Sequence, residues 1–354
     1  MITTGGSGGH VFPGLAVAHR LVALGARVFW LGTREGIEAR LVPQHGIDFE
    51  SISFRGVRGK GLATMLLGPF ALVAACVDAA RVLRRRRPDV VIGFGGFASF
   101  PGALMGVATR RPLVLHEANA VAGLANRILA FGADRLLLGF PGAFGTRHRA
   151  ISEFTGNPLR DDIVATPRPE QRFAGRGGPL RLLVVGGSLG AQALNERVPE
   201  AIATLDRLAR PQVVHQAGAR HIDALRAAYA RHRVDGECVA FIDDMAARYA
   251  WADFVICRGG ALTVAELAAV GLGSLIVPLP GAIADEQTAN ADYLVQAGAA
   301  TCVAQQALDA AAIAHVLART TRERALQMAI AARHVARADA AGRIADTCVA
   351  VGTR

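Results

Sequence analysis

The chain has 354 residues, of which 52% are hydrophobic, and it carries a formal net charge of +10 at pH 7. This length and hydrophobicity suffice for two folded domains. The basic charge suits anionic partners such as nucleotides or acidic lipid headgroups, or it reflects a genomic base bias that favours arginine codons. Only 6% of the residues are aromatic and they do not alternate with basic residues, which disfavours a nucleic-acid-binding surface.

The cysteines and the chain start favour a cytoplasmic protein. Five scattered cysteines, at positions 76, 238, 257, 302 and 348, form no CxxC pair and no cysteine–histidine cluster. Such a distribution is typical of reduced thiols rather than of a disulfide framework. The opening residues MITTGG show no signal peptide. The longest apolar stretch, 62–77, is broken by Gly68 and Pro69 and is short for a membrane span.

Strand and helix patterns alternate through the first half. Residues 1–4 leave little room for a first strand, and 55–61 have the composition of a basic, flexible loop. An apolar helix pair or kinked helix is predicted over 62–83, ending in Arg84 to Arg87. The other predicted elements are a helix over 11–24, strands over 27–32, 47–54, 89–93, 112–117 and 135–139, and a helix that begins or kinks at Pro101.

The second half repeats this alternation. Residues 167–179 are rich in proline, glycine and arginine and are interpreted as the linker region. Strands are predicted over 180–185, 212–216, 238–242 and 274–278, and helices fill the tail, the last from about Gly342. Strands that alternate with helices predict an α/β fold with parallel sheets.

Glycine turns recur at matching places in the two halves. Turns between an apolar strand and a helix occur at 5–9, 93–96, 186–190 and 259–260, and the first and third are near copies, GGSGGH and GGSLGA. Each half thus has one glycine turn at its start and another further on. This pattern predicts two Rossmann-like halves.

The last of these turns lies in the stretch CRGGALTVAELAAVG, residues 257–271. The apolar run 254–256 reads as a buried strand, and after the glycines the apolar residues follow helical spacing. A glycine turn that leads from a strand into a helix N-terminus is suited to binding a diphosphate. Taken alone, the pattern is equally that of a tight strand–helix turn.

Motifs spread over nearly the whole chain resemble the MurG family. They are GGSGGHVFPGLAVA, LGTREGIEARLVPQHGI, RGKG, GFGGFASFPG, HEANAVAGLANR, GNPLR, GGSLGAQALN, FIDDMAARYAWAD, CRGGALTVAELAAVGLGSLIVP and DEQTANADYL, in that order. The resemblance implies the GT-B architecture, in which two Rossmann-like domains face a central cleft. It implies a first domain of residues 1–160 with about 337–354, facing acceptor and membrane, and a UDP-GlcNAc-binding domain of 161–336.

This family transfers GlcNAc from UDP-GlcNAc to the C4 hydroxyl of MurNAc in the undecaprenyl-linked lipid I, which gives lipid II for peptidoglycan. The resemblance implies an inverting single displacement without a metal or other cofactor, and the sequence contains no Asp-x-Asp pair. Helix N-termini, backbone N–H groups and arginine would then stabilise the UDP leaving group. The implied location is the cytoplasmic face of the bacterial inner membrane, as a peripheral protein with possible cell-wall synthesis partners and no nucleic acid.

The resemblance also implies roles for individual residues. Ile242 would lie against uracil, and Glu266 would accept hydrogen bonds from the ribose hydroxyls. Gln287 and Asn290 would hold GlcNAc hydroxyls, and Arg160 would contact the nucleotide at the domain junction. The diphosphate would be surrounded by Ser188, Ala261, Leu262 and Thr263, with Val264 and Ala265 in the same substrate-binding stretch. The first-domain face of the cleft would be lined by Ser7, Gly8, Gly9, His10 and Asn119.

The attacking hydroxyl must lose a proton, so the site needs a general base. His10 is one candidate, because it stands at a helix start, where the dipole favours the neutral imidazole. His10 could equally position a phosphate or sugar without taking the proton. Glu117, beside Asn119, is the competing base.

Several positions depart from the family pattern: Leu189, Ala118, Gly260 and the segment 280–290, which lacks the usual histidines and one acid. These changes leave Glu266, Gln287, Asn119 and His10 in place, so an active transferase is expected. Alternatives are a degenerate relative that binds a nucleotide sugar without transfer, or another GT-B enzyme that acts on UDP-GlcNAc. A Rossmann dehydrogenase fits least, because the turns are not G-x-G-x-x-G.

The apolar stretch 62–77, followed by Arg81 and Arg84 to Arg87, has the composition of a segment that lies on an anionic membrane surface. A core helix with a solvated, charged end is the alternative interpretation.

Overall fold

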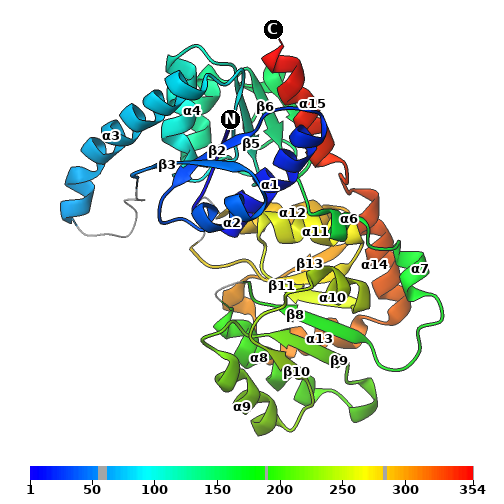
Figure 1. Cartoon of the computed structure of the whole chain (residues 1–354). Coiled ribbons are helices and arrows are strands. Elements are labelled where there is room, and N and C mark those ends of the chain that lie inside the picture. Colours follow the sequence, from blue (N-terminus) through cyan, green and yellow to red (C-terminus); the bar gives the residue numbers. More distant parts are fainter. Residues whose placement is uncertain (55–61, 188–189, 282–284, 354) are drawn as a thin grey trace. The chain divides into compact units, whose positions relative to one another are not determined.

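Two parallel β-sheets, each built by its own part of the chain, organise the protein (Figure 1). The computed structural model describes residues 1–54, 62–187, 190–281 and 285–353, with only the backbone for 62–67. The first compact unit comprises Met1–Arg160 and Ala338–Arg354, and the second comprises Asp161–Arg337.

The first unit contains a seven-stranded sheet with the order β3-β2-β1-β4-β5-β6-β7, in which all pairs are parallel. β1 is only two residues long, yet it lies in the centre, where Ile2 pairs with Trp30 on one side and Ile92 on the other. The strands are β1 Ile2–Thr3, β2 Phe29–Thr33, β3 Asp48–Ile52, β4 Val91–Gly93, β5 Leu113–Glu117, β6 Arg135–Leu138 and β7 Ser152–Phe154.

Helices cover both faces of this sheet and create a core on each. The helices are α1 Gly8–Ala23, α2 Glu38–Gln44, α3 Leu62–Arg86, α4 Ser99–Ala108, α5 Leu124–Leu129 and α15 Ala340–Gly352. On one face Val11 and Leu15 of α1 and Ile344 and Cys348 of α15 pack with Trp30. The other face buries residues of α3, α4 and α5 against β5 and β6. The end of the chain is therefore part of the first unit's core.

The second unit contains a six-stranded parallel sheet with the order β10-β9-β8-β11-β12-β13. β8, with the sequence RLLVV, is central, and a continuous apolar run is what a strand covered on both faces requires. The strands are β8 Arg181–Val185, β9 Gln212–Gln216, β10 Glu237–Val239, β11 Phe254–Cys257, β12 Gly273–Ile276 and β13 Ala300–Cys302.

The second unit's helices are α6 Asp161–Val164, α7 Pro169–Phe173, α8 Gln192–Thr204, α9 Ile222–His232, α10 Met245–Trp251, α11 Ala261–Val270, α12 Glu286–Gln296, α13 Ala310–Arg319 and α14 Arg322–His334. Its main core joins the strands to α8, α9 and α13, and a smaller cluster joins Phe173 of α7 to Ala325 and Ala329 of α14. α11 ends at Gly271, whose φ of 74° is the left-handed conformation that glycine adopts readily.

These observations confirm the predicted α/β class, the parallel sheets and the two Rossmann-like halves. Three segments differ in detail. The 62–83 region is one continuous helix, α3, with Pro69 inside it; a proline removes one backbone hydrogen bond, and the helix continues on both sides. Residues 167–179, interpreted as a linker, include the ordered helix α7. The strand predicted over 238–242 ends at Val239, so Ile242 lies in the loop before α10.

Candidate functional site

The glycine turns follow the two central strands of each sheet. The turns at 5–9 and 94–96 follow β1 and β4, and those at 186–190 and 259–260 follow β8 and β11. In both sheets the strand order reverses between these two strands. Open α/β sheets bind ligands in the crevice at the carboxyl ends of the strands on either side of such a switch point. The sequence repetition therefore marks the ligand-binding edge of each unit.

The two turns of the first unit touch. The Thr4 hydroxyl donates to the Gly95 carbonyl at 3.2 Å. Gly96 has a φ of 77°, and a Cβ there would lie 2.7 Å from the Gly5 carbonyl oxygen. A side chain at position 96 would thus meet both a backbone strain and a clash.

His10 lies in the first turn of α1, beside these glycines. Its Nδ1 is 2.9 Å from the Ser7 hydroxyl, which joins two predicted site residues. A Cβ on Gly95 would be 3.7 Å from His10 Nε2, so the imidazole lies against the second glycine turn. Desolvation lowers the pKa of His10 below 6.5. The neutral imidazole, which is the form that accepts a proton, is therefore favoured at neutral pH.

Glu117, at the end of β5, is surrounded by hydrogen-bond donors. Its Oε1 accepts from the backbone N–H of Asn119 at 3.0 Å and from Asn119 Nδ2 at 3.4 Å. Its Oε2 accepts from the Gly123 N–H at 3.1 Å and from Asn126 Nδ2 at 2.9 Å. Burial raises the pKa of Glu117, and these hydrogen bonds oppose that rise. This carboxylate organises the 119–126 loop, a role that ties up its acceptor positions.

Two residues of this edge were missed by the sequence analysis. His116 is fully buried, and its Nε2 is 3.2 Å from the Gly156 carbonyl, so Nε2 carries the hydrogen. Burial lowers the pKa of His116 to about 4, which keeps it neutral. Asn126 is also buried, and it bridges the His116 carbonyl and Glu117. Both stand in the HEANAVAGLANR motif, but only their burial shows what they do.

In the second unit, Gly260 is the N-cap residue of α11 and supplies no side-chain cap. The N–H groups of Ala261, Leu262 and Thr263 are in the helix's first turn, where α-helices leave N–H groups without helical partners. The Val264 N–H donates to the Gly260 carbonyl at 3.0 Å, and the Val264 side chain is buried. The first-turn N–H groups and the positive end of the helix dipole suit an anion such as a diphosphate.

Glu266, in the middle of α11, is half-buried, and its Oε2 accepts a hydrogen bond from the Tyr249 hydroxyl at 3.0 Å. Tyr249 belongs to α10 and was not among the predicted site residues. Ala265, beside Glu266, is half-buried as well. Nothing in the spacing of 249 and 266 indicates this contact, because it depends on how α10 packs.

Gln287 and Asn290, on α12, both contact the Gly259 backbone. Gln287 Oε1 accepts from the N–H groups of Gly259 at 3.2 Å and Leu279 at 2.9 Å. Asn290 is fully buried, and its Nδ2 donates to the Gly259 carbonyl at 3.1 Å. The two side chains thus fix the glycine turn that precedes α11. Since Oε1 of Gln287 is engaged by backbone donors, its amide Nε2 is the atom suited to donating to a sugar hydroxyl.

The other predicted site residues are placed individually. Ile242 is 7% exposed and precedes α10. Arg160 is half-buried and is the last residue of the first unit's long segment. Gly8 and Gly9 open α1. Ser188 lies outside the described residues, as does Leu189.

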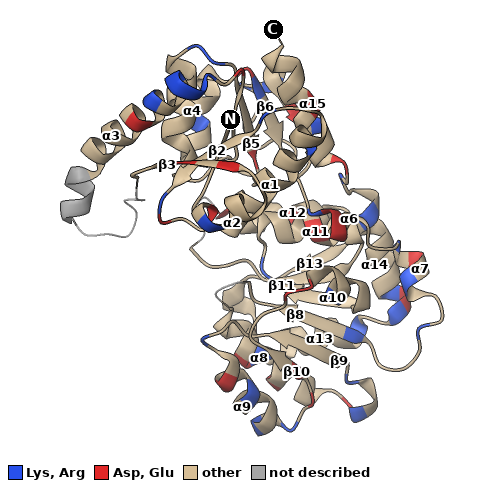
Figure 2. Ribbon diagram, viewed as in Figure 1, with Lys and Arg blue, Asp and Glu red and all other residues tan. Residues whose placement is uncertain are grey.

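Charged side chains cluster on the second half of α3, which Figure 2 shows as blue bands. Arg85 pairs with Glu50 at 2.6 Å, Arg86 with Asp48 at 2.7 Å and Arg81 with Asp78 at 2.9 Å. The same helix exposes Phe70, Val73 and Val77, which are 74%, 63% and 44% accessible. Acidic neighbours therefore compensate part of the arginine charge beside this apolar face.

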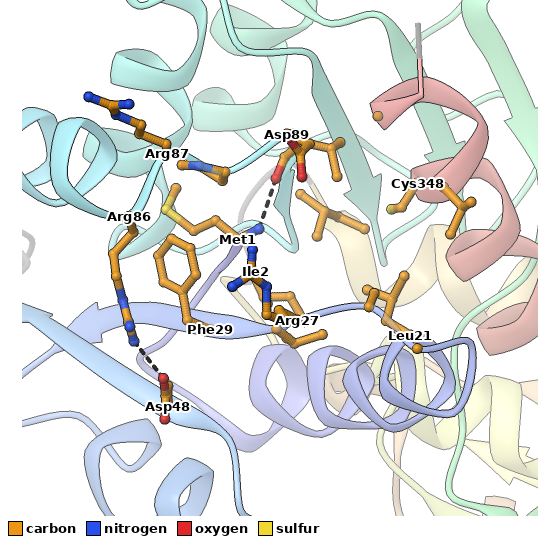
Figure 3. A pocket seen from close by; sticks show the side chains of 18 of the residues that line it. Met1, Ile2, Leu21, Arg27, Phe29, Asp48, Arg86, Arg87, Asp89 and Cys348 are labelled. Carbon is orange, nitrogen blue, oxygen red and sulfur yellow. Dashed lines mark hydrogen bonds and ion pairs between the residues drawn. The ribbon is translucent and has the colours of Figure 1, made fainter.

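A cavity of about 500 Å³ lies at the opposite, amino-terminal edge of the first sheet (Figure 3). Met1, Phe29, Asp89 and Cys348 are among its lining residues, and the Met1 ammonium donates to the Val90 carbonyl at 2.8 Å. None of the predicted site residues lines it. Within residues 1–54, 62–187, 190–281 and 285–353, no cluster of three or more His, Cys, Asp or Glu is arranged to hold a metal. No helix in the described part of the chain is both long and apolar enough to cross a bilayer.

Two family models match the chain. The glycosyltransferase family 28 N-terminal domain matches residues 1–138, and the family's C-terminal domain matches residues 181–344. A curated protein of Burkholderia thailandensis is 54% identical over 99% of this chain and 95% of its own length. One of Burkholderia pseudomallei is 53% identical with the same coverage. Both are named UDP-N-acetylglucosamine–N-acetylmuramyl-(pentapeptide) pyrophosphoryl-undecaprenol N-acetylglucosamine transferase.

Solved structures agree. The crystal structure of Acinetobacter baumannii MurG has a TM-score of 0.85 and 36% identity, with 99% of each chain covered. The glycosyltransferase of kitacinnamycin has a TM-score of 0.73 at 18% identity, which shows a shared fold alone. With two parallel α/β units, the architecture is GT-B. The chain belongs to glycosyltransferase family 28.

Proposed function

We propose that this protein is an inverting glycosyltransferase that moves GlcNAc from UDP-GlcNAc to the C4 hydroxyl of MurNAc in lipid I, the step that makes lipid II for peptidoglycan. The observation that carries the proposal is 54% identity, over 99% of the chain, to a transferase whose name states this donor and acceptor. Part of the expected site supports it as well, since Ser7 and His10 follow β1, and Thr263 and Glu266 follow β11, each a central strand of its sheet.

In this proposal the second unit, Asp161–Arg337, binds the donor. The start of α11 receives the diphosphate on its backbone N–H groups, with Ser188 and Arg160 as further contacts. Glu266 accepts the ribose hydroxyls, Ile242 contacts uracil, and Gln287 and Asn290 serve the GlcNAc side. Because an anion at a helix N-terminus is stabilised by dipole and hydrogen bonds together, departure of UDP needs no metal ion.

The first unit, Met1–Arg160 with Ala338–Arg354, receives lipid I at the glycine turns, near Ser7, Gly8, Gly9 and Asn119. We assign His10 as the general base. Its lowered pKa keeps it neutral, and the Ser7 hydroxyl at Nδ1 orients the ring. Glu117 is the poorer base, because four donors already hold its carboxylate in the loop.

The test is transfer of labelled GlcNAc from UDP-GlcNAc to a lipid I analogue in excess EDTA, with wild type, His10→Ala, Glu117→Gln and Glu266→Ala. We expect wild-type transfer to survive EDTA. Loss of a general base costs about 10²- to 10⁴-fold in rate, so His10→Ala should fall in that range. Folded wild-type protein that binds UDP-GlcNAc without transferring it would overturn the proposal.

We further propose that α3 docks the protein on the anionic, cytoplasmic face of the inner membrane. Phe70, Val73 and Val77 present an apolar face, and the arginines that follow add positive charge. Leu66, also apolar, has no described side chain. Phe70→Asp with Val73→Asp should abolish binding to phosphatidylglycerol vesicles and leave transfer to a water-soluble acceptor within about twofold. Leu208→Asp, at a fully exposed leucine of the second unit, is the control. Undiminished vesicle binding by the α3 variant would refute the docking.

A further inference from the structure

The Tyr249 hydroxyl and the Glu266 carboxylate form a hydrogen bond inside the second unit. The phenol oxygen donates to Oε2 over 3.0 Å, and Tyr249 is only 1% exposed while Glu266 is half-buried. An ionised carboxylate has about four acceptor positions, and the phenol occupies one of them. The bond therefore restricts where the carboxylate points.

The phenol is itself held in place. Arg172 of α7, which is 8% exposed, donates from Nη1 to the Tyr249 carbonyl at 3.4 Å. Its Nη2 donates to the Val270 carbonyl at 3.1 Å and to the Gly271 carbonyl. One buried guanidinium thus connects the helix that carries Tyr249 to the carboxyl end of the helix that carries Glu266. The backbones of the two helices that carry the phenol and the carboxylate are thus tied together.

We propose that Tyr249 is a positioning residue for ribose recognition: its hydroxyl holds the Glu266 carboxylate in the orientation that accepts the 2′ and 3′ hydroxyls of the nucleotide. This inference rests on the proposed function for the role of Glu266. A glutamate has three rotatable side-chain bonds, and immobilising it when the ligand arrives costs binding free energy. The hydrogen bond from Tyr249 already immobilises the Glu266 carboxylate when the protein folds, so ligand binding does not have to immobilise it again.

The effect must be specific to the ribose diol. In this inference Tyr249 acts through Glu266, so a ligand without the two hydroxyls gains nothing from an oriented carboxylate. A purely structural tyrosine would instead affect all ligands alike. The affinity ratio between UDP and 2′,3′-dideoxy-UDP separates these roles, and because both ligands are measured on one sample, a reduced folded fraction cancels from the ratio.

The chain contains three tyrosines, and the other two supply matched controls. The Tyr293 hydroxyl donates to the Val335 carbonyl, and the Tyr229 hydroxyl is 3.1 Å from His215 Nδ1. Neither contacts a predicted site residue through that hydroxyl in these bonds. Tyr293→Phe and Tyr229→Phe therefore remove a bonded phenol hydroxyl from the same unit without touching Glu266.

The experiment measures dissociation constants of UDP and 2′,3′-dideoxy-UDP by calorimetry for wild type, Tyr249→Phe, Glu266→Ala, their double variant and the two controls. A hydrogen bond to a charged group contributes about 1.5–3 kcal/mol, so we expect Tyr249→Phe to raise the dissociation constant of UDP about tenfold. The dideoxy ligand should change less than about twofold. In the Glu266→Ala background, Tyr249→Phe should add less than about twofold, because the effect passes through the carboxylate.

The kinetic readout is a split between KM and kcat. KM for UDP-GlcNAc should rise about tenfold in Tyr249→Phe, with kcat within about threefold, because the ribose is remote from the anomeric carbon. Equal weakening of both ligands, or no change in either, overturns the inference while leaving the proposed function intact if wild type transfers GlcNAc. Wild-type protein that binds UDP but transfers no GlcNAc would overturn the proposed function alone, and the ligand ratio would still decide the role of Tyr249.

Discussion

A methyl group added at Gly96 tests whether the two glycine turns of the first unit pack as closely as the structure shows. Gly96 has a φ of 77°, and its added Cβ would lie 2.7 Å from the Gly5 carbonyl oxygen. Gly142, in the same unit, has a φ of 81° with nothing within 4 Å of its Cβ position. Gly142→Ala therefore measures the conformational cost alone, and Gly96→Ala measures that cost together with the clash.

The left-handed conformation costs an L-residue about 1–2 kcal/mol. Forcing an extra carbon into a packed site adds about 1–3 kcal/mol. For a domain of about 150–250 residues, 1 kcal/mol corresponds to about 2–4 °C in Tm. We thus expect Gly142→Ala to lower Tm by a few degrees and Gly96→Ala to lower it by roughly twice as much. The Cβ at position 96 also comes 3.7 Å from His10 Nδ1, so Gly96→Ala should reduce kcat as well.

Scanning calorimetry with intrinsic fluorescence gives the two Tm values, and the lipid I transfer assay gives the rates. Gly142→Ala should retain wild-type kcat. Equal Tm losses in the two variants would refute the reasoning, because they would mean that the Gly5 carbonyl is not where the 96 side chain would go.

Three further predictions follow from buried titratable groups. Asp253 is fully buried and pairs with Arg176 and Arg322, so Asp253→Asn should lower the free energy of urea unfolding by about 3–5 kcal/mol. The control Asp223→Asn changes a carboxylate that is 95% exposed and should lower it by less than about 0.5 kcal/mol. Similar losses in the two variants would contradict this prediction. Burial lowers the pKa of His215 to about 3 in the folded protein, whereas in the unfolded chain it is about 6.5. Between these two pH values only the unfolded chain binds the proton, so the free energy of unfolding should fall by up to about 1.4 kcal/mol for each pH unit below 6.5. This slope should be smaller in His215→Gln. An unchanged slope in that variant would contradict the assignment. Because desolvation lowers the pKa of His10, the acid limb of kcat/KM should be centred below pH 6.5. An acid limb centred above 6.5 would exclude His10 as the base.

The α/β class, the parallel sheets and the two Rossmann-like halves could be predicted because glycine turns and apolar strands are local signals. Gly186 and Gly259, which begin the two turns of the second unit, follow its first and fourth strands in chain order, as the repeated pattern predicts. The two-residue strand β1 was not predicted, because residues 1–4 leave little room for a strand. Its central place in the sheet follows from the Rossmann order rather than from its length.

Long-range packing could not be predicted. Residues 167–179 have the composition of a linker, but Phe173 is buried against α14 and Arg172 caps the end of α11. The contacts that decide this lie about 80 to 160 residues away in the chain, beyond any local pattern. The Tyr249–Glu266 bond and the burial of His116 belong to the same class. All roles assigned to site residues by resemblance, those of Glu266, Gln287 and Asn290 included, remain predictions.

Helix α15 bears on how the protein is made. Its residues Ile344 and Cys348 share a core with Val11 and Trp30, so the first unit's hydrophobic interior is incomplete until α15 has left the ribosome. The second unit, Asp161–Arg337, is continuous in sequence and has all its strands earlier. Vectorial synthesis usually lets the amino-terminal domain fold first. Here the order is inverted: the second unit can complete its fold while the nascent first unit still exposes the surface that α15 later covers.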